Sequence, residues 1–164
     1  MEKVKIGIVG LGRLGKRHAF NLANVVPKAN LRAVCSLNEA ELQWAKNELE
    51  IPQLFLSFED MLAHADIDAV WIASSSAFHA SQAKAALEHG FHVFVEKPMG
   101  LTLKECAEIE HAVQNHNDQV FLVGFVRRFD PSYRYAKELV ATGAIGTPFL
   151  VRSQTCDLDE YAEF

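Results

Sequence analysis

The sequence predicts an α/β fold of the Rossmann type, a doubly wound parallel sheet with helices on both faces. Two observations support this prediction. Short apolar runs alternate with helical patterns over most of the chain, and a glycine-rich segment at residues 10–15 directly follows the first apolar run. Strands that alternate with helices in this way favour a parallel sheet, because each helix carries the chain back to the same edge.

The first half of the chain predicts three strands, each followed by a helix. Residues 4–9 are a short apolar run, and apolar positions from Leu14 to Val25 then recur at helical spacing until Pro27 ends the helix. The next strands are expected at residues 31–35 and 55–58. The helices after them are expected at residues 39–49, with Asn38 as the N-cap, and at residues 59–65.

The second half of the chain continues the alternation. Thr102 and Glu105 have the spacing of a capping box, and Ser76 is the candidate N-cap of a helix that should end before Gly90. The predicted strands are residues 68–73, 91–95 and 120–123. The predicted helices are residues 77–89, 103–114 and 131–141.

The pattern changes towards the end of the chain. We expect residues 1–125 to form the Rossmann domain and residues 126–164 to begin a second, α+β domain. After Gly143, an extended run from Thr147 to Thr155 is followed by no helix, and the chain ends in an acidic segment. This pattern predicts a truncated C-terminal domain, in which the extended run is an unpaired edge.

Composition and charge exclude several classes of protein. Of the 164 residues, 49% are apolar and 23% are charged, which is typical of a packed globular chain. The net charge of −5 gives no basic field for nucleic acid, and no apolar stretch is long enough to span a bilayer. Widely spaced cysteines and histidines predict no disulfide and no metal site, which indicates a cytoplasmic protein with reduced thiols.

The segment from Gly10 to Gly15 predicts a binding site for a dinucleotide phosphate, because it lies between a predicted strand and a predicted helix. Gly10 allows the tight turn, Gly12 lets the backbone approach the pyrophosphate, and Gly15 lets the helix pack closely on the strand. A glycine turn without a ligand, and a site for S-adenosylmethionine or another adenosine ligand, are the alternatives. The residues expected to bind the phosphates are Gly10, Leu11, Gly12, Arg13, Leu14 and Gly15.

The end of the second predicted strand leaves the choice between NAD and NADP open. Many NAD sites place a carboxylate there, which accepts hydrogen bonds from the adenosine ribose. This sequence has Ser36, which does not repel the 2′-phosphate of NADP, and no arginine follows at once to bind that phosphate. We expect Ser36 and Leu37 to border the adenosine.

The segment Glu96-Lys97-Pro98 follows a strand that ends at the same edge of the sheet as the glycine segment. Open parallel sheets bind their ligands at this edge. Lys97 offers a positive charge and three donors to a substrate hydroxyl, and it can stabilise the alkoxide character that develops as a hydride leaves. A surface lysine in a turn is the alternative interpretation.

Four segments together resemble the Gfo/Idh/MocA oxidoreductases. They are GLGRLG at residues 10–15, the helix around His79, HVFVEKP at 92–98 and GAIGTP at 143–148. Within that family, the segments that look most like inositol 2-dehydrogenases and related polyol dehydrogenases are GLGRLGKRHAFNLA, AVCSLNEAELQWA and GFVRRFDPSY.

The resemblance implies an enzyme that moves a hydride between a ring hydroxyl of a cyclic polyol or sugar, inositol first, and the nicotinamide of NAD or NADP. It implies that Lys97 is catalytic and contacts the substrate, that Glu96 shapes its turn, that both residues contact the cofactor, and that the Lys97–Pro98 bond is cis. Arg127 matches a substrate-pocket residue. The residues implied at the nicotinamide ribose are Ala73, Ser74 and Ser75.

The resemblance further implies a homo-oligomer, and a general-base histidine, paired with an aspartate, beyond Phe164. The 164 residues alone are therefore expected to be inactive. The sequence departs from the commoner family pattern at Ser36, where an aspartate is usual, and at Ser75-Ser76, where a proline-asparagine type of turn is usual.

Several interpretations stay open at this point. His79 can contact the cofactor or can serve packing and capping at the start of its helix. Arg127 can bind substrate or form a surface ion pair. The whole chain can also be a sensor or regulatory protein that keeps the dinucleotide fold without its chemistry, because a fold does not fix a function.

Overall fold

A computed structural model describes residues 2–154 of the chain. The chain divides into two compact units between Gly124 and Phe125.

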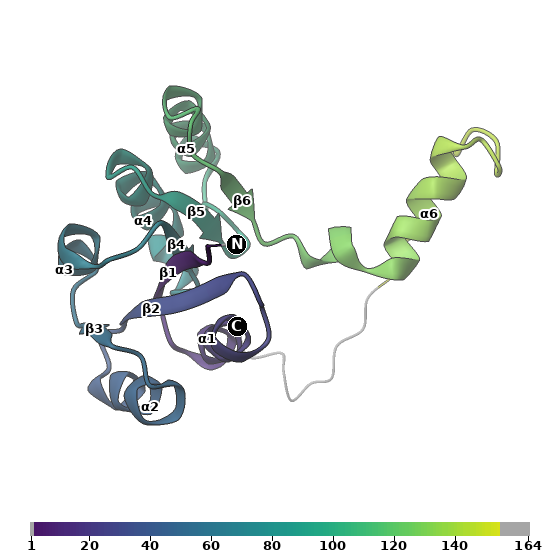
Figure 1. The fold of residues 1–164 in the computed structure, drawn as a ribbon. Coiled ribbons are helices and arrows are strands. Elements are labelled where there is room, and N and C mark those ends of the chain that lie inside the picture. Colours follow the sequence, from purple (N-terminus) through teal and green to yellow (C-terminus); the bar gives the residue numbers. More distant parts are fainter. Residues whose placement is uncertain (1, 155–164) are drawn as a thin grey trace. The chain divides into compact units, whose positions relative to one another are not determined.

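The first unit contains a six-stranded sheet in the order β3-β2-β1-β4-β5-β6 (Figure 1). Every pair of neighbouring strands is parallel. The predicted doubly wound parallel sheet is therefore confirmed. The strands are β1 (Val4–Val9), β2 (Ala29–Cys35), β3 (Gln53–Phe55), β4 (Ala69–Ile72), β5 (His92–Val95) and β6 (Phe121–Val123).

Five helices connect these strands, and local capping explains where several of them begin. Asn38 accepts a hydrogen bond from the backbone N–H of Ala40, as predicted, and Thr102 and Glu105 form the predicted capping box. The helices are α1 (Arg13–Asn24), α2 (Glu39–Leu49), α3 (Phe58–His64), α4 (Ser76–Glu88) and α5 (Leu103–Asn115).

Several predicted bounds differ from the observed ones by one or two residues, and two errors have a local physical reason. The predicted strand at residues 55–58 is instead Gln53–Phe55, because Ser57 caps α3 and Phe58 already packs into the core from the first turn of that helix. The N-cap of α4 is Ser75 rather than Ser76, and its side chain makes no capping hydrogen bond. Both errors lie between a strand and the helix that follows it, where the bounds of elements are least precise in a prediction from sequence.

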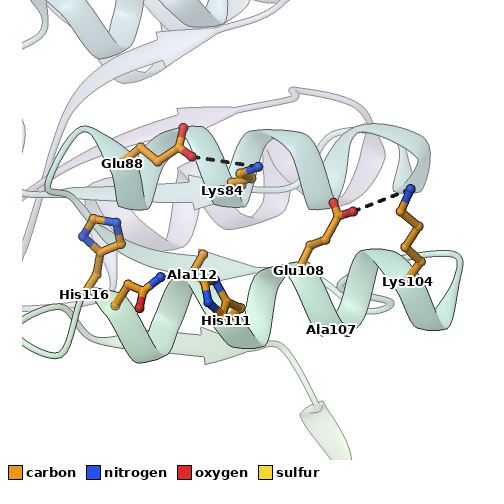
Figure 2. A pocket seen from close by; sticks show the side chains of 9 residues that line it. Lys84, Glu88, Lys104, Ala107, Glu108, His111, Ala112 and His116 are labelled. Atoms are coloured by element: carbon orange, nitrogen blue, oxygen red, sulfur yellow. Dashed lines mark hydrogen bonds and ion pairs between the residues drawn. The ribbon is translucent and has the colours of Figure 1, made fainter.

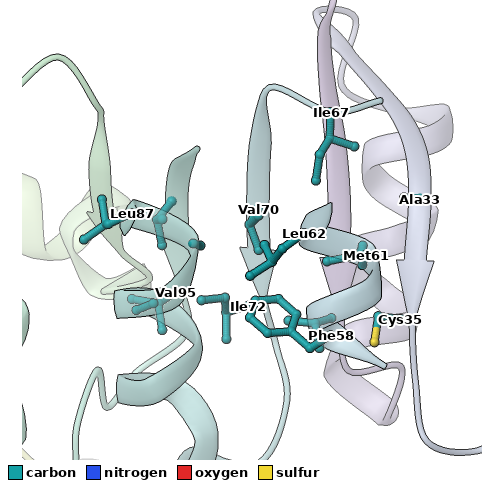
Figure 3. Close-up of a cluster of buried hydrophobic side chains, with 14 of the residues drawn as sticks. Ala33, Cys35, Phe58, Met61, Leu62, Ile67, Val70, Ile72, Leu87 and Val95 are labelled. Carbon is teal, nitrogen blue, oxygen red and sulfur yellow. The ribbon is translucent and has the colours of Figure 1, made fainter. Parts of the chain in front are cut away.

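The core has one cluster on each face of the sheet. On one face, side chains from α3, α4 and α5 pack on alternate positions of the strands, including Ala33, Cys35, Val70 and Ile72 (Figure 3). On the other face, α1 and α2 cover Ile6, Ile8, Leu31 and Val34. Burial on both faces explains why the strands are apolar runs without a polar side.

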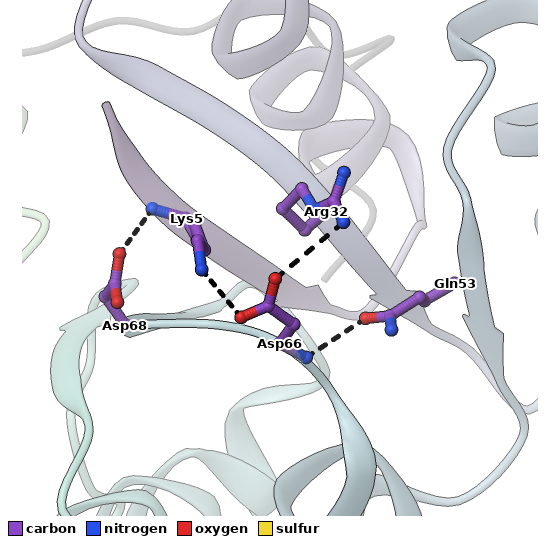
Figure 4. Close-up of polar contacts among 5 residues, drawn as sticks. All are labelled: Lys5, Arg32, Gln53, Asp66 and Asp68. Atoms are coloured by element: carbon purple, nitrogen blue, oxygen red, sulfur yellow. Dashed lines mark hydrogen bonds and ion pairs between the residues drawn. The ribbon is translucent and has the colours of Figure 1, made fainter. Parts of the chain in front are cut away.

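Charged side chains gather at the amino ends of the central strands (Figure 4). Lys5 Nζ lies 2.7 Å from Asp66 Oδ1, and Arg32 Nη2 lies 3.8 Å from Asp66 Oδ2. The Asp66 N–H donates to Gln53 Oε1, and the Lys5 N–H donates to Asp68 Oδ2. The hydrogen bond to Lys5 lowers the pKa of Asp66, and the same bond raises the pKa of Lys5.

The described part of the second unit consists of a 3-10 helix, η1 (Val126–Phe129), and α6 (Pro131–Ala141). Asp130 caps α6 by accepting from the N–H groups of Ser132 and Tyr133. None of residues 125–154 is buried. Within residues 2–154, no helix is both long and apolar enough to cross a membrane.

The predicted extended run at residues 147–155 does not form a strand over 147–154. A strand needs hydrogen bonds from a neighbouring strand, and the second unit has no strand in its described part. Thr155, Cys156 and the acidic segment at 157–164 lie outside the described residues.

Candidate dinucleotide-binding site

A pocket of about 760 Å³ lies at the carboxyl ends of the strands in the first unit. Its walls come from the loops that follow β1, β2, β3 and β4, together with Phe78 and Gln82 of α4. The strand order reverses between β1 and β4. Ligands of open parallel sheets bind at such a reversal, so the pocket has the position expected of a cofactor site.

The pocket brings together ten of the residues predicted to bind the cofactor. They are Gly10, Leu11, Gly12, Arg13, Leu14, Ser36, Leu37, Ala73, Ser74 and Ser75. Gly15, His79, Glu96 and Lys97 do not line it.

The backbone of the glycine segment explains the need for glycine at two positions. Gly10 has a φ of +87°, and a Cβ atom there would lie 2.5 Å from the backbone of Ser74. A Cβ atom on Gly15 would collide with the carbonyl of Gly10, so this glycine lets α1 approach the end of β1. At both positions, any side chain would push the phosphate loop away from the sheet.

Gly12 differs from these two glycines, because a Cβ atom there would meet nothing within 4 Å. Gly12 is the N-cap of α1 and has no side chain that could cap the helix. The first turn that follows it contains no acidic residue. The positive end of the helix dipole therefore faces the pocket without a carboxylate from that turn to balance it. This is the arrangement that binds phosphate at a helix N-terminus.

Ser36 is 7% exposed and lies at the start of the loop after β2. Its Oγ donates to Glu41 Oε2 at 2.5 Å and accepts from the Asn38 N–H at 3.1 Å. Glu41 stands in the first turn of α2 and also lines the pocket. Sequence reasoning missed Glu41, although an acidic residue in the first turn of the helix after β2 was a visible signal.

His79 is 2% exposed and connects two loops at the carboxyl edge. Its Nδ1 lies 2.7 Å from the carbonyl oxygen of Pro98, and its Nε2 lies 3.0 Å from that of Ser74. The ring therefore joins the loop after β4 to the turn after β5. This contact favours the packing role for His79, whereas its contact with the cofactor stays a prediction.

The turn at residues 96–98 has the cis Lys97–Pro98 bond that the family resemblance predicted. Glu96 Oε1 lies 2.9 Å from His18 Nε2 of α1, and Glu96 Oε2 accepts from the Lys97 N–H. His18 in turn packs against the rings of Trp71 and Phe94, which stack 3.7 Å apart. The Lys97 side chain itself is exposed.

The pocket wall also contains a thiol that is not ionised. Burial raises the pKa of Cys35 to about 12, and the nearby carboxylates of Glu59 and Asp60 add to the effect. A hydrogen bond from its own backbone N–H, followed by one from the Ser57 hydroxyl, lowers the pKa of Glu59 itself. The charged residues that line the pocket are Arg13, Glu41 and Glu59.

Arg127 lies in η1 of the second unit. Its Nη1 is 3.3 Å from Asp130 Oδ2, and its guanidinium lies 5.5 Å from the centre of the Tyr133 ring. The surface ion pair of the alternative interpretation is thus present, and the substrate contact of Arg127 stays a prediction.

A second groove, of about 540 Å³, lies between α4 and α5 (Figure 2). Two ion pairs border it, Lys84 with Glu88 at 4.0 Å and Lys104 with Glu108 at 3.9 Å, each within one helix. Such pairs stabilise the helices that carry them. Over residues 2–154, no group of three or more His, Cys, Asp or Glu side chains is arranged to hold a metal ion.

The fold and the pocket define a dinucleotide-binding domain, and comparison with known proteins agrees. The chain matches the Gfo/Idh/MocA oxidoreductase family with an NAD-binding Rossmann fold over residues 4–125, and it belongs to that family.

Several of the similar proteins are dehydrogenases of inositols. The chain is 52% identical to the scyllo-inositol dehydrogenase from Lactobacillus casei, whose crystal structure holds NAD(H) and scyllo-inositol. The TM-score is 0.86 over 88% of this chain and 43% of that chain. The chain is 36% identical to the scyllo-inositol 2-dehydrogenase (NAD(+)) of Bacillus subtilis, over 95% of this chain and 45% of that protein.

It is also 32% identical to the inositol 2-dehydrogenase of Salmonella typhimurium, over 98% of this chain and 48% of that protein. The chain therefore spans less than half the length of each of these three relatives.

Proposed function

We propose that this chain binds NAD(H) in the pocket at the carboxyl edge, as the cofactor-binding part of a polyol dehydrogenase. The reaction is hydride transfer between the nicotinamide and a ring hydroxyl of a cyclic polyol, with an inositol as the first substrate. The observation that carries the proposal is the uncapped N-terminus of α1 behind Gly12, which opens into the pocket. The names of the inositol dehydrogenase relatives support the substrate class.

In this proposal the backbone of residues 10–15 receives the pyrophosphate. The N–H groups in the first turn of a helix have no acceptor within the helix, so phosphate oxygens can accept from them. Ser36 and Leu37 border the adenosine, because they line the pocket at the end of β2. The nicotinamide ribose lies at the loop after β4, whose lining residues are Ala73, Ser74 and Ser75.

Lys97 is the residue that we propose for the chemistry. Its ammonium group donates a hydrogen bond to the substrate hydroxyl and stabilises the negative charge that grows on that oxygen as the hydride leaves. Glu96 positions the turn through its contacts with His18 and with the Lys97 N–H. We propose no general base among the described residues, and we expect the 164-residue chain to bind cofactor without oxidising a polyol.

The proposal extends to the partners of the protein and to its location in the cell. The net charge of −5 favours a small-molecule ligand over a nucleic acid partner. The buried, un-ionised thiol of Cys35 is compatible with the reducing cytoplasm. Association into a homo-oligomer is part of the same proposal and rests on the family resemblance alone.

Calorimetric titration of the 164-residue chain with NAD and NADH tests the binding step. We expect micromolar dissociation constants, and we expect Gly12→Ala to weaken binding at least tenfold, about 1.4 kcal/mol, because a methyl group would stand where the pyrophosphate approaches. Leu103→Ala, at an exposed position on α5, is the matched control and should bind like the parent. A folded chain that binds neither nucleotide would contradict the proposal.

The catalytic step is tested by adding inositol and NAD to the same chain and following NADH formation. We expect no turnover above background, because the chain spans less than half of the dehydrogenases it matches. A steady rate of NADH formation would show that the described residues hold a complete catalytic site, and the assignment of the general base elsewhere would be wrong.

A further inference from the structure

The loop after β2 offers a carboxylate to the pocket from an unexpected position. Ser36 occupies the place where many NAD sites have an acidic residue, and its Oγ donates to Glu41 Oε2 at 2.5 Å. Glu41 comes from the first turn of α2, five residues further along the chain. Both residues line the same wall of the pocket.

The geometry fixes the direction of this hydrogen bond. The Asn38 N–H donates to Ser36 Oγ at 3.1 Å, so the single hydroxyl hydrogen of Ser36 points away from it and towards Glu41. Ser36 is 7% exposed, and its hydroxyl has few other partners to choose from. The serine thus acts as an anchor for the carboxylate of Glu41.

Two further features suit the Glu41 carboxylate to binding a ligand. It stands in the first turn of α2, where the helix dipole stabilises a negative charge. Ser36 engages Oε2, and among residues 2–154 no hydrogen bond is made to Oε1. One carboxylate oxygen is therefore available to a ligand in the pocket.

We propose that Glu41 replaces the missing acidic residue at the end of β2 and makes this site selective for NAD(H) over NADP(H). The Oε1 atom accepts hydrogen bonds from the adenosine ribose hydroxyls, as a carboxylate at position 36 would. This inference rests on the proposed cofactor site and identifies the residue that makes this site prefer NAD(H).

Charge explains the selectivity. A 2′-phosphate has only acceptor oxygens and a negative charge, so beside the Glu41 carboxylate it loses hydrogen bonds and is repelled. The pocket lining contains one guanidinium, Arg13, against the carboxylates of Glu41 and Glu59. Leu37 follows Ser36 and is 85% exposed, so the side chain next to the anchor has no donor for a phosphate.

Calorimetric titration of the 164-residue chain with NADH and with NADPH measures the selectivity. We expect the parent to bind NADH at least tenfold more tightly than NADPH. Glu41→Gln removes the charge and keeps the size. It should reduce the ratio of the NADPH dissociation constant to the NADH dissociation constant by about tenfold or more, mainly by tighter NADPH binding. Glu39→Gln is the matched control, because it makes the same charge change in the same helix turn outside the pocket lining.

Ser36→Ala supplies a second, independent variant. It removes the anchor but keeps the carboxylate, so the ratio should fall by less than in Glu41→Gln. Circular dichroism and the melting temperature establish that each variant is folded. If Glu41→Gln does not fold, the fall in the ratio for Ser36→Ala carries the test, and an unchanged ratio there overturns the inference.

The outcomes separate the inference from the proposed function. A parent that binds NADH and NADPH equally well, or a Glu41→Gln variant that binds NADH with an unchanged ratio, overturns the role of Glu41 and leaves the cofactor site intact. A folded parent that binds neither nucleotide overturns the cofactor site itself, and the inference falls with it.

Discussion

The two ends of the carboxyl edge are built in different ways. At the pocket, Gly15 packs on the carbonyl of Gly10 and the Ser36 hydrogen bond reaches only five residues ahead, although Gly10 itself lies against the backbone of Ser74. At the turn of residues 96–98, the shape depends on His79, 19 residues from Pro98, and on His18, 78 residues from Glu96. Apart from Gly10, the contacts at the first end are local in sequence, whereas those at the second end join residues far apart in the chain.

This difference indicates which variants should damage binding alone and which should damage stability. A residue that faces open pocket space can be changed without loss of folding, but a residue that joins distant segments cannot. The following variants test the distinction, from the largest expected effect to the smallest.

Gly10→Ala should have the largest effect on stability. The residue must adopt a φ of +87°, and the new Cβ atom would press on the backbone of Ser74. We expect a loss of about 3 kcal/mol in the free energy of unfolding, measured by urea denaturation. Gly12→Ala is the comparison and should stay within about 0.5 kcal/mol of the parent, because nothing lies within 4 Å of its Cβ position. Equal losses would contradict the distinction.

His79→Ala should come next. The change leaves the carbonyls of Ser74 and Pro98 without their buried partner, so we expect a loss of about 2 kcal/mol in the same measurement. His89→Ala, at an exposed histidine that follows the same helix, should lose much less. A His79→Ala variant as stable as the parent would show that the bridge between the two loops does not stabilise the fold.

His18→Ala should lose about 1.5 kcal/mol, because it removes one partly buried hydrogen bond to Glu96 and the packing of the imidazole on Trp71 and Phe94. The exposed neighbour Arg17, changed to Ala, is the control on the same helix. We also expect the amide of Lys97 to exchange with solvent faster in His18→Ala, because Glu96 is then held less firmly. An unchanged exchange rate would argue against a positioning role for His18.

Asp66→Asn should have the smallest effect, and one that depends on pH. The pKa of Asp66 is lowered in the folded chain, mainly by the hydrogen bond to Lys5, so its contribution to stability is present above the pKa of an unfolded aspartate. The contribution disappears as the pH falls through the lowered value. We expect a slightly lower melting temperature for Asp66→Asn at neutral pH, no difference in strong acid, and unchanged NADH binding at the opposite edge.

Patterns of local origin were predicted from the sequence, and long-range contacts were not. The parallel sheet, the capping box of Thr102 and the cis bond at Pro98 were predicted, because they follow from alternation, spacing or motif. The bounds of β3 were wrong, because the packing of Phe58 decides where that strand ends. The contact between His18 and Glu96 joins residues 78 positions apart, which no local pattern reveals.

Glu41 is an instructive omission. Its position in the first turn of α2 was visible, but sequence reasoning looked for an acidic residue only at the end of the strand. The hydrogen bond from Ser36 connects the two positions. At residues 147–154 the sequence pattern predicted too much rather than too little. An extended run was predicted there, but a strand forms only beside another strand, and none forms over these residues.

Hydrogen–deuterium exchange with and without NADH tests the central claim most directly. The first hydrogen bond within α1 runs from the Lys16 N–H to the Gly12 carbonyl, so the amides just before Lys16 depend on a ligand for protection. We predict that NADH slows exchange at residues 12–15 and 36–41 and leaves the groove between α4 and α5 unchanged. Saturating NADH without protection at residues 12–15 would contradict the claim that this loop binds the cofactor.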